Sequence, residues 1–99
     1  MIVVRDIFQL KYGKARDAKQ LLKEGMPIFK KYADFPMRIL TDLVGPAYTL
    51  VMESEHESLA AYETSLKSEL GADEWHAWYQ KYIPLVESSR REIFTIVDL

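Results

Sequence analysis

β-branched and aromatic residues dominate the start of the chain and predict a β-strand over Ile2–Leu10, whose successive side chains alternate between its two faces. Val4 and Phe8 fall on one side of the alternation and Val3 and Ile7 on the other. Both faces of this strand therefore hold apolar groups.

The hydrophobic period changes to that of a helix after this strand. Between Ala15 and Ala33 apolar residues recur every three or four positions, with charged residues in the gaps. Pro27 lies inside this pattern and removes one helical hydrogen bond. We expect one amphipathic helix with a kink near Lys23–Pro27 rather than two helices.

Two apolar runs, Met37–Val44 and Ala47–Ser54, predict a β-hairpin that turns at Gly45-Pro46. Ser54 and Glu57 then have the spacing of a capping box, which predicts the start of a second helix.

Gly71 is expected to end the second helix, and Asp73 to cap a third one that contains Pro84. The third helix carries an aromatic stripe at helical spacing. The stripe consists of Trp75, Trp78, Tyr79 and Tyr82, and Val86 extends it. Alternation over Arg91–Leu99 predicts a last strand.

The element order βαββααβ predicts an α+β, ferredoxin-like fold. Right-handed crossovers give a four-stranded, mainly antiparallel sheet in the order 4-1-3-2 with the helices on one face. Apolar residues also point to the other face, and no helix remains to cover it. We therefore expect residues 1–99 to form a single domain that pairs with a second copy into a homodimeric α/β barrel.

The composition of the chain excludes several classes of protein. The 99 residues are 48% hydrophobic and 28% charged, which is typical of a globular chain and not of a disordered one. Cysteine is absent, which excludes disulfides, thiolate metal sites and thiol nucleophiles. No apolar run approaches the roughly 20 residues that span a bilayer. We expect a cytoplasmic protein that does not bind membranes.

The net charge of −2 conceals two oppositely charged halves. Residues 1–40 hold nine Lys and Arg against four Asp and Glu, whereas residues 41–99 hold four against eleven. The lysines of the first helix lie mostly on its water side and are diluted by acidic residues, so they indicate a solvated surface. We expect no nucleic-acid partner.

Two segments resemble a known family. The first strand through Gly13 and Lys14, and Asp73–Trp78 with the chain that follows to Phe94, are similar to NIPSNAP-type domains of the dimeric α/β-barrel superfamily. The resemblance covers nearly the whole chain. It implies the barrel fold and a ligand pocket between sheet and helices.

The superfamily also implies several activities: cofactor-independent monooxygenases of antibiotic biosynthesis, haem-degrading enzymes, lactone isomerases and stress-response barrels. In the haem-degrading branch an asparagine would stand where this chain has Asp6, and the branch's tryptophan and histidine spacing is not reproduced. We expect no cofactor.

Asp6 is the most informative candidate residue, because strict alternation places its carboxylate among the apolar groups that face the helices. It is either a base in a pocket or one half of a salt bridge with Arg91 or Arg38. His76 beside the aromatic stripe is either its acid/base partner or a surface histidine. The two histidines are too far apart in sequence to suggest a metal site.

The sequence leaves three hypotheses open. The first is a homodimer that binds an apolar or aromatic small molecule, the second a cofactor-independent monooxygenase or isomerase acting through Asp6 and His76, and the third a purely structural dimer. Arg5, on the opposite face, is expected to pair with Glu53 or Thr49. The residues expected to line the pocket are Phe8, Phe29, Arg38, Tyr48, Trp75, Trp78 and Tyr79.

Overall fold

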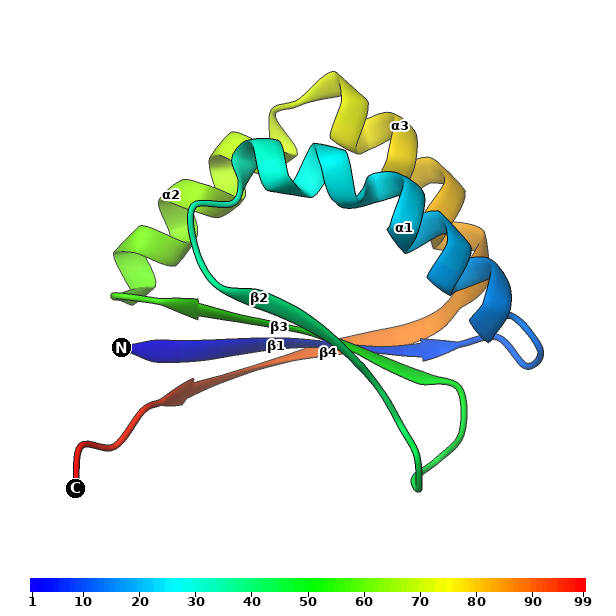
Figure 1. Cartoon of the computed structure of the whole chain (residues 1–99), viewed down its shortest axis with the longest axis horizontal. Helices are drawn as coiled ribbons and strands as arrows, with labels where there is room; N and C mark the ends of the chain where they lie inside the picture. Colours follow the sequence, from blue (N-terminus) through cyan, green and yellow to red (C-terminus); the bar gives the residue numbers. More distant parts are fainter.

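A computed structural model describes all residues, 1–99, as one four-stranded sheet with a layer of helices on one side (Figure 1). The strands are β1 (Ile2–Leu10), β2 (Met37–Thr41), β3 (Thr49–His56) and β4 (Val86–Thr95). The helices are α1 (Ala15–Tyr32), α2 (Leu59–Leu70) and α3 (Asp73–Tyr82), and a 3-10 turn covers Ile83–Leu85.

The sheet has the order β2-β3-β1-β4 and every pairing is antiparallel. This is the predicted ferredoxin-like order 4-1-3-2 read from the other edge, so the predicted fold is confirmed. Asp6 on the central strand β1 pairs with Met52 on β3 and with Arg91 on β4. None of the helices is long and apolar enough to cross a membrane.

The core lies between the sheet and the helices. Leu10 and Leu50 from the sheet meet Leu22 and Phe29 from α1 and Trp78 from α3, all of them buried. The amphipathic pattern of α1 is therefore confirmed, and the helix continues through Pro27 as one element.

The start of α2 was predicted wrongly. Ser54 belongs to β3, where it pairs with Met37 on β2 and with Val4 on β1. The helix is capped instead by Ser58, whose hydroxyl accepts a hydrogen bond from the backbone N–H of Ala61 at 3.1 Å. Cross-strand pairing on both sides of β3 outweighs the local capping-box signal.

The hairpin turn between β2 and β3 is wider than Gly45-Pro46. The carboxylate of Asp42 accepts hydrogen bonds from the backbone N–H groups of Ala47 and Thr49 at 2.7 and 3.1 Å. These bonds end both strands early and close a seven-residue loop, in which Ala47 and Tyr48 have positive φ angles.

The last third of the chain needs two corrections. Asp73 is the first residue of α3 and makes no capping hydrogen bond, while Pro84 lies in the 3-10 turn rather than inside the helix. β4 begins at Val86, five residues before Arg91, and ends at Thr95. Pairing with the whole length of β1 fixes these limits.

Candidate functional site

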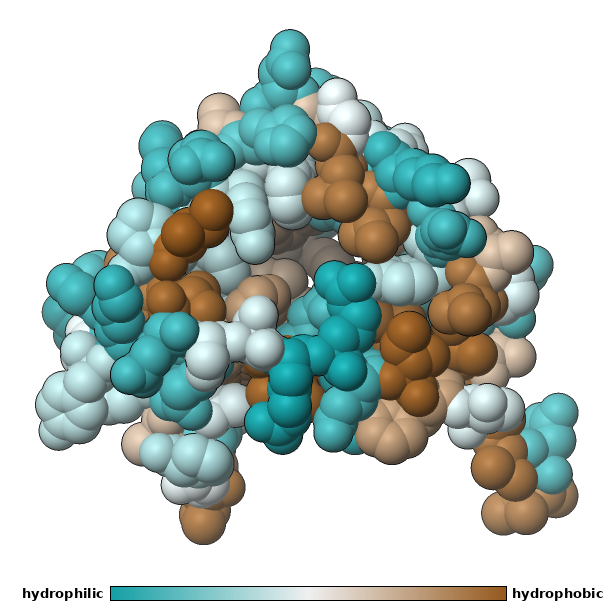
Figure 2. Space-filling model, turned by 180° about the vertical axis from the view of Figure 1, so that it is seen from behind, coloured by the Kyte–Doolittle hydropathy of each residue, from teal (hydrophilic) through white to brown (hydrophobic).

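A cavity of about 440 Å³ lies between the sheet and the helical layer. It opens between the edge strand β4 and helices α2 and α3, and Figure 2 shows a hollow on this side of the molecule. The lining residues are Asp6, Phe8, Phe29, Met52, Leu66, Glu69, Leu70, Trp75, Trp78, Tyr79, Tyr82, Ser89, Arg90 and Arg91.

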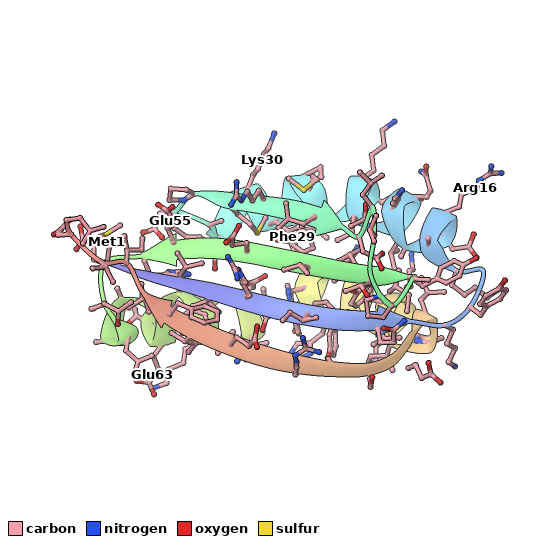
Figure 3. All side chains as sticks on the ribbon, turned by 90° about the horizontal axis from the view of Figure 1, so that it is seen from below. Met1, Arg16, Phe29, Lys30, Glu55 and Glu63 are labelled. Carbon is pink, nitrogen blue, oxygen red and sulfur yellow. The ribbon has the colours of Figure 1, made fainter.

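Aromatic side chains of α3 form one wall, because residues three and four apart share one face of a helix. The rings of Trp75 and Tyr79 stack with their centroids 4.6 Å apart, and those of Trp78 and Tyr82 with centroids 5.1 Å apart. Phe29 from α1 meets Trp78 edge-on. In Figure 3, Phe29 lies on the helix side of the sheet. The wall presents broad apolar surfaces to the cavity.

An ion pair lies on the sheet at the bottom of the cavity. Arg91 donates from Nε to the carboxylate of Asp6 at 2.5 Å, across the register of β1 and β4. Burial by itself lowers the pKa of Arg91, but the bond to Asp6 and its charge raise it overall. The Arg91 guanidinium also lies over the ring of Tyr62, 5.6 Å from the ring centroid. The structure therefore shows the salt-bridge alternative for Asp6.

Glu69 brings a second carboxyl group into the cavity from α2. Its side chain takes part in none of the seven salt bridges of the protein. Burial raises the pKa of Glu69, the indole of Trp75 offsets part of this effect, and the negative charge of Asp6 adds to it. Glu69 is thus the cavity carboxylate that lacks a cationic partner.

Tyr82 carries a buried hydroxyl group that has no hydrogen-bond partner in the protein. Burial, together with the neighbouring Tyr79 and Asp6, raises the pKa of this phenol. The hydroxyl therefore stays protonated at neutral pH.

Six predicted site residues line the cavity: Asp6, Phe8, Phe29, Trp75, Trp78 and Tyr79. Three others do not, and these predictions need correction. His76 is exposed, because its position on α3 turns away from the sheet, and its ring lies edge-on to that of Trp75 with 5.4 Å between the ring centroids. Asp6 and His76 therefore do not face a common cavity.

Arg38 and Tyr48 lie elsewhere. Arg38 is on the helix-free face, where it binds the buried carboxylate of Glu53. Arg5 binds the same carboxylate, with 3.1 Å between its Nε and Oε1 of Glu53. This arrangement follows from strand alternation, and it includes the Arg5–Glu53 pair expected from the sequence. Tyr48 lies in the loop before β3 and packs on Tyr12, 4.9 Å between ring centroids.

Glu69 was not predicted as a site residue, although the sequence contains a signal for it. Glu69 follows Leu66 by three positions and Tyr62 by seven, which places a charged residue on the apolar stripe of α2. The same reasoning had singled out Asp6 on its strand. The protein has no group of three or more His, Asp or Glu side chains that could hold a metal ion.

Comparison with known proteins supports the fold. No family model matches the sequence, and no curated protein matches it. An uncharacterised NIPSNAP domain protein from Burkholderia xenovorans has a similar structure, with a TM-score of 0.90, 15% identity, and coverage of 98% of this chain and 95% of the other.

A NIPSNAP family protein from Agrobacterium tumefaciens gives a TM-score of 0.89 at 21% identity, covering 98% of this chain and 93% of its own. SnoaB, a cofactor-independent oxygenase from Streptomyces nogalater, gives 0.72 at 12% identity, with 99% and 94% covered. The resemblance to NIPSNAP domains is confirmed as a likeness of fold, and at these identities the fold is all that it shows.

Proposed function

We propose that the protein binds a small apolar or aromatic molecule in the cavity between the sheet and the helices. The observation that carries this proposal is the cavity itself, which combines a volume of about 440 Å³ with six aromatic side chains and a few polar groups. Ligand sites generally measure roughly 300 to 1,000 Å³ and have this mixture of lining groups.

The stacked pairs of α3 favour a flat ligand, because aromatic rings gain most from offset-stacked and edge-on contacts. Trp75 and Tyr79 are only partly buried, so a ligand that covers them also removes exposed apolar surface from water. The alternative of a cofactor-independent monooxygenase or isomerase acting through Asp6 and His76 lacks this support, since His76 lies outside the cavity.

A titration followed by calorimetry tests the binding proposal. The probe is 2-naphthalenemethanol, whose two fused rings are smaller than the cavity. Leu66→Trp puts a large side chain into the cavity, whereas Leu59→Trp adds the same group on the exposed part of the same helix. We expect binding by the wild type and Leu59→Trp and none by Leu66→Trp. Absence of binding by the wild type, or equal binding by all three proteins, would refute the proposal.

We also propose that the protein forms a homodimer through the helix-free face of the sheet. Figure 3 shows this face from below, with no helix in front of the strands. It presents the exposed apolar side chains of Leu40 and Phe94 beside the compact ionic cluster on Glu53. A face with exposed apolar groups suits an identical sheet, because each copy brings the same apolar groups to the contact.

The mass of the particle in solution tests the homodimer. Light scattering coupled to size-exclusion chromatography should give twice the chain mass of 11.5 kDa. Leu40→Asp on the helix-free face should shift the protein toward monomer, and Leu59→Asp on the helical layer should not. A wild-type protein that stays monomeric at high concentration would contradict the proposal.

A further inference from the structure

Four charged residues line the cavity, and three of them already have a partner. Asp6 and Arg91 bind each other at 2.5 Å, and Arg90 has Glu92 within 3.9 Å. Glu69 is the fourth and forms no salt bridge. With these groups and Glu92 ionised, the two salt-bridged pairs are each neutral, and Glu69 contributes one negative charge that has no salt-bridge partner.

A bound ligand removes water from Glu69. The energetic effect on the carboxylate depends on whether the ligand is neutral, anionic or cationic. A neutral ligand leaves the carboxylate desolvated or forces it to take up a proton. An anionic ligand adds repulsion from Glu69. A cationic ligand brings the missing counter-charge, so it is the class that the cavity accommodates at least cost.

The aromatic wall supports the same class of ligand. Cations are attracted to the faces of Trp and Tyr rings within about 6 Å, and tryptophan is the strongest of the aromatic residues in this respect. Trp75 and Tyr79 line the cavity on α3, and Trp75 lowers the pKa of the Glu69 carboxyl group beside it. A carboxylate and aromatic rings thus share one part of the cavity.

We propose that the cavity selects organic cations, in which a protonated or quaternary amine on an apolar or aromatic body lies beside the Glu69 carboxylate. This inference rests on the proposed binding function and names the ligand class of that site. It requires no reaction: the ligand is recognised by an ion pair, by cation–π contact and by burial of its apolar part.

The selection depends on pH through Glu69. The titratable and charged groups around it are Asp6 on β1, Arg90 and Arg91 on β4, Tyr79 and Tyr82 on α3, and Tyr62 on its own helix. Burial raises the pKa of Glu69 above its ordinary value of 4.5, so the carboxylate takes up a proton at a pH where an exposed glutamate is still charged. The preference for a cation should disappear as the pH falls through this pKa.

The experiment compares three probes of one shape and different charge: 2-naphthylmethylamine, 2-naphthalenemethanol and 2-naphthoate. Each is titrated at neutral pH into the wild type, Glu69→Gln and Glu63→Gln. Glu63 is the matched control, because it lies on the same helix with an exposed side chain that faces Lys67 and does not line the cavity. Circular dichroism confirms that the variants are folded.

We expect the wild type and Glu63→Gln to bind the amine roughly tenfold more tightly than the alcohol, and the acid most weakly. Glu69→Gln should bind the amine and the alcohol about equally. Equal affinities in the wild type, or a preference that survives Glu69→Gln, would overturn the inference while leaving the binding function intact. Absence of binding by all three probes would overturn the binding function itself.

Discussion

Gly25 lies in the middle of α1. Its replacement by alanine distinguishes the effect of helix propensity on stability from the effect of packing between α1 and α3. Helix propensity alone predicts that Gly25→Ala stabilises the protein by about 1 kcal/mol. The structure predicts the opposite, because a Cβ atom at this position would lie 2.5 Å from Nε1 of Trp78 and 2.9 Å from two further atoms of the indole.

The indole has little room to move away. Trp78 is buried, donates from Nε1 to the backbone carbonyl of Leu21 at 2.7 Å, and packs against Phe29 and Tyr82. Overpacking costs about 1 to 3 kcal/mol, and loss of the hydrogen bond about 1 kcal/mol more. After the gain in helix propensity of about 1 kcal/mol, Gly25→Ala should destabilise the protein by about 1 to 3 kcal/mol.

Urea denaturation of four proteins measures this effect: the wild type, Gly25→Ala, Trp78→Phe and the double variant. Phenylalanine has a smaller ring and lacks Nε1 with its hydrogen bond to Leu21, so this ring has more room to shift and Gly25→Ala should cost less in the Trp78→Phe background than in the wild type. If Gly25→Ala stabilises the wild type, or if the two substitutions are additive, the close packing of α1 on Trp78 is refuted.

Three further predictions concern single side chains. Tyr82→Phe should leave the free energy of unfolding unchanged or raise it by about 1 kcal/mol, because it removes a buried hydroxyl without a partner; a loss measured by urea denaturation would show that the hydroxyl is satisfied. Arg38 and then Arg5 lower the pKa of Glu53 below its ordinary value of 4.5, so the stability that Glu53 contributes is present above that value and lost as the pH falls below it. The difference in stability between the wild type and Glu53→Gln should therefore shrink on acidification, and a constant difference would contradict this. Ser58→Ala should cost about 1 kcal/mol by thermal denaturation through loss of the helix cap, whereas Glu57→Ala should have little effect; the reverse order would restore the capping-box interpretation.

The spacing of hydrophobic residues, together with the residues that end helices and strands, was enough to predict the fold. The limits of β1 were predicted to the residue, and the start of α1 and the end of α2 at Gly71 also agree with the structure. These signals are local: alternation, helical spacing and a helix terminator. The limits of β4 were predicted poorly, because they depend on the strand beside it and not on its own residues.

Site residues were predicted correctly only where the face of a strand or helix on which a residue lies determines whether its side chain reaches the cavity. Asp6 and the aromatic residues of α3 reach the cavity because strand parity and helical period point them there. His76 and Arg38 have suitable chemistry, but the same periodicities turn them away from it. Glu69 depends on how α2 packs over the sheet, and sequence spacing alone does not reveal that it lacks a cationic partner.

The central claim is that ligands bind between the sheet and the helices, and NMR spectroscopy tests it most directly. The chain has two tryptophans, Trp75 and Trp78, and both line the cavity, so their indole N–H signals report on it. On titration with 2-naphthalenemethanol we expect saturable shifts of the Trp75 indole and of the Leu66 and Glu69 amides. Shifts confined to the helix-free face, or no saturable shifts at all, would contradict it.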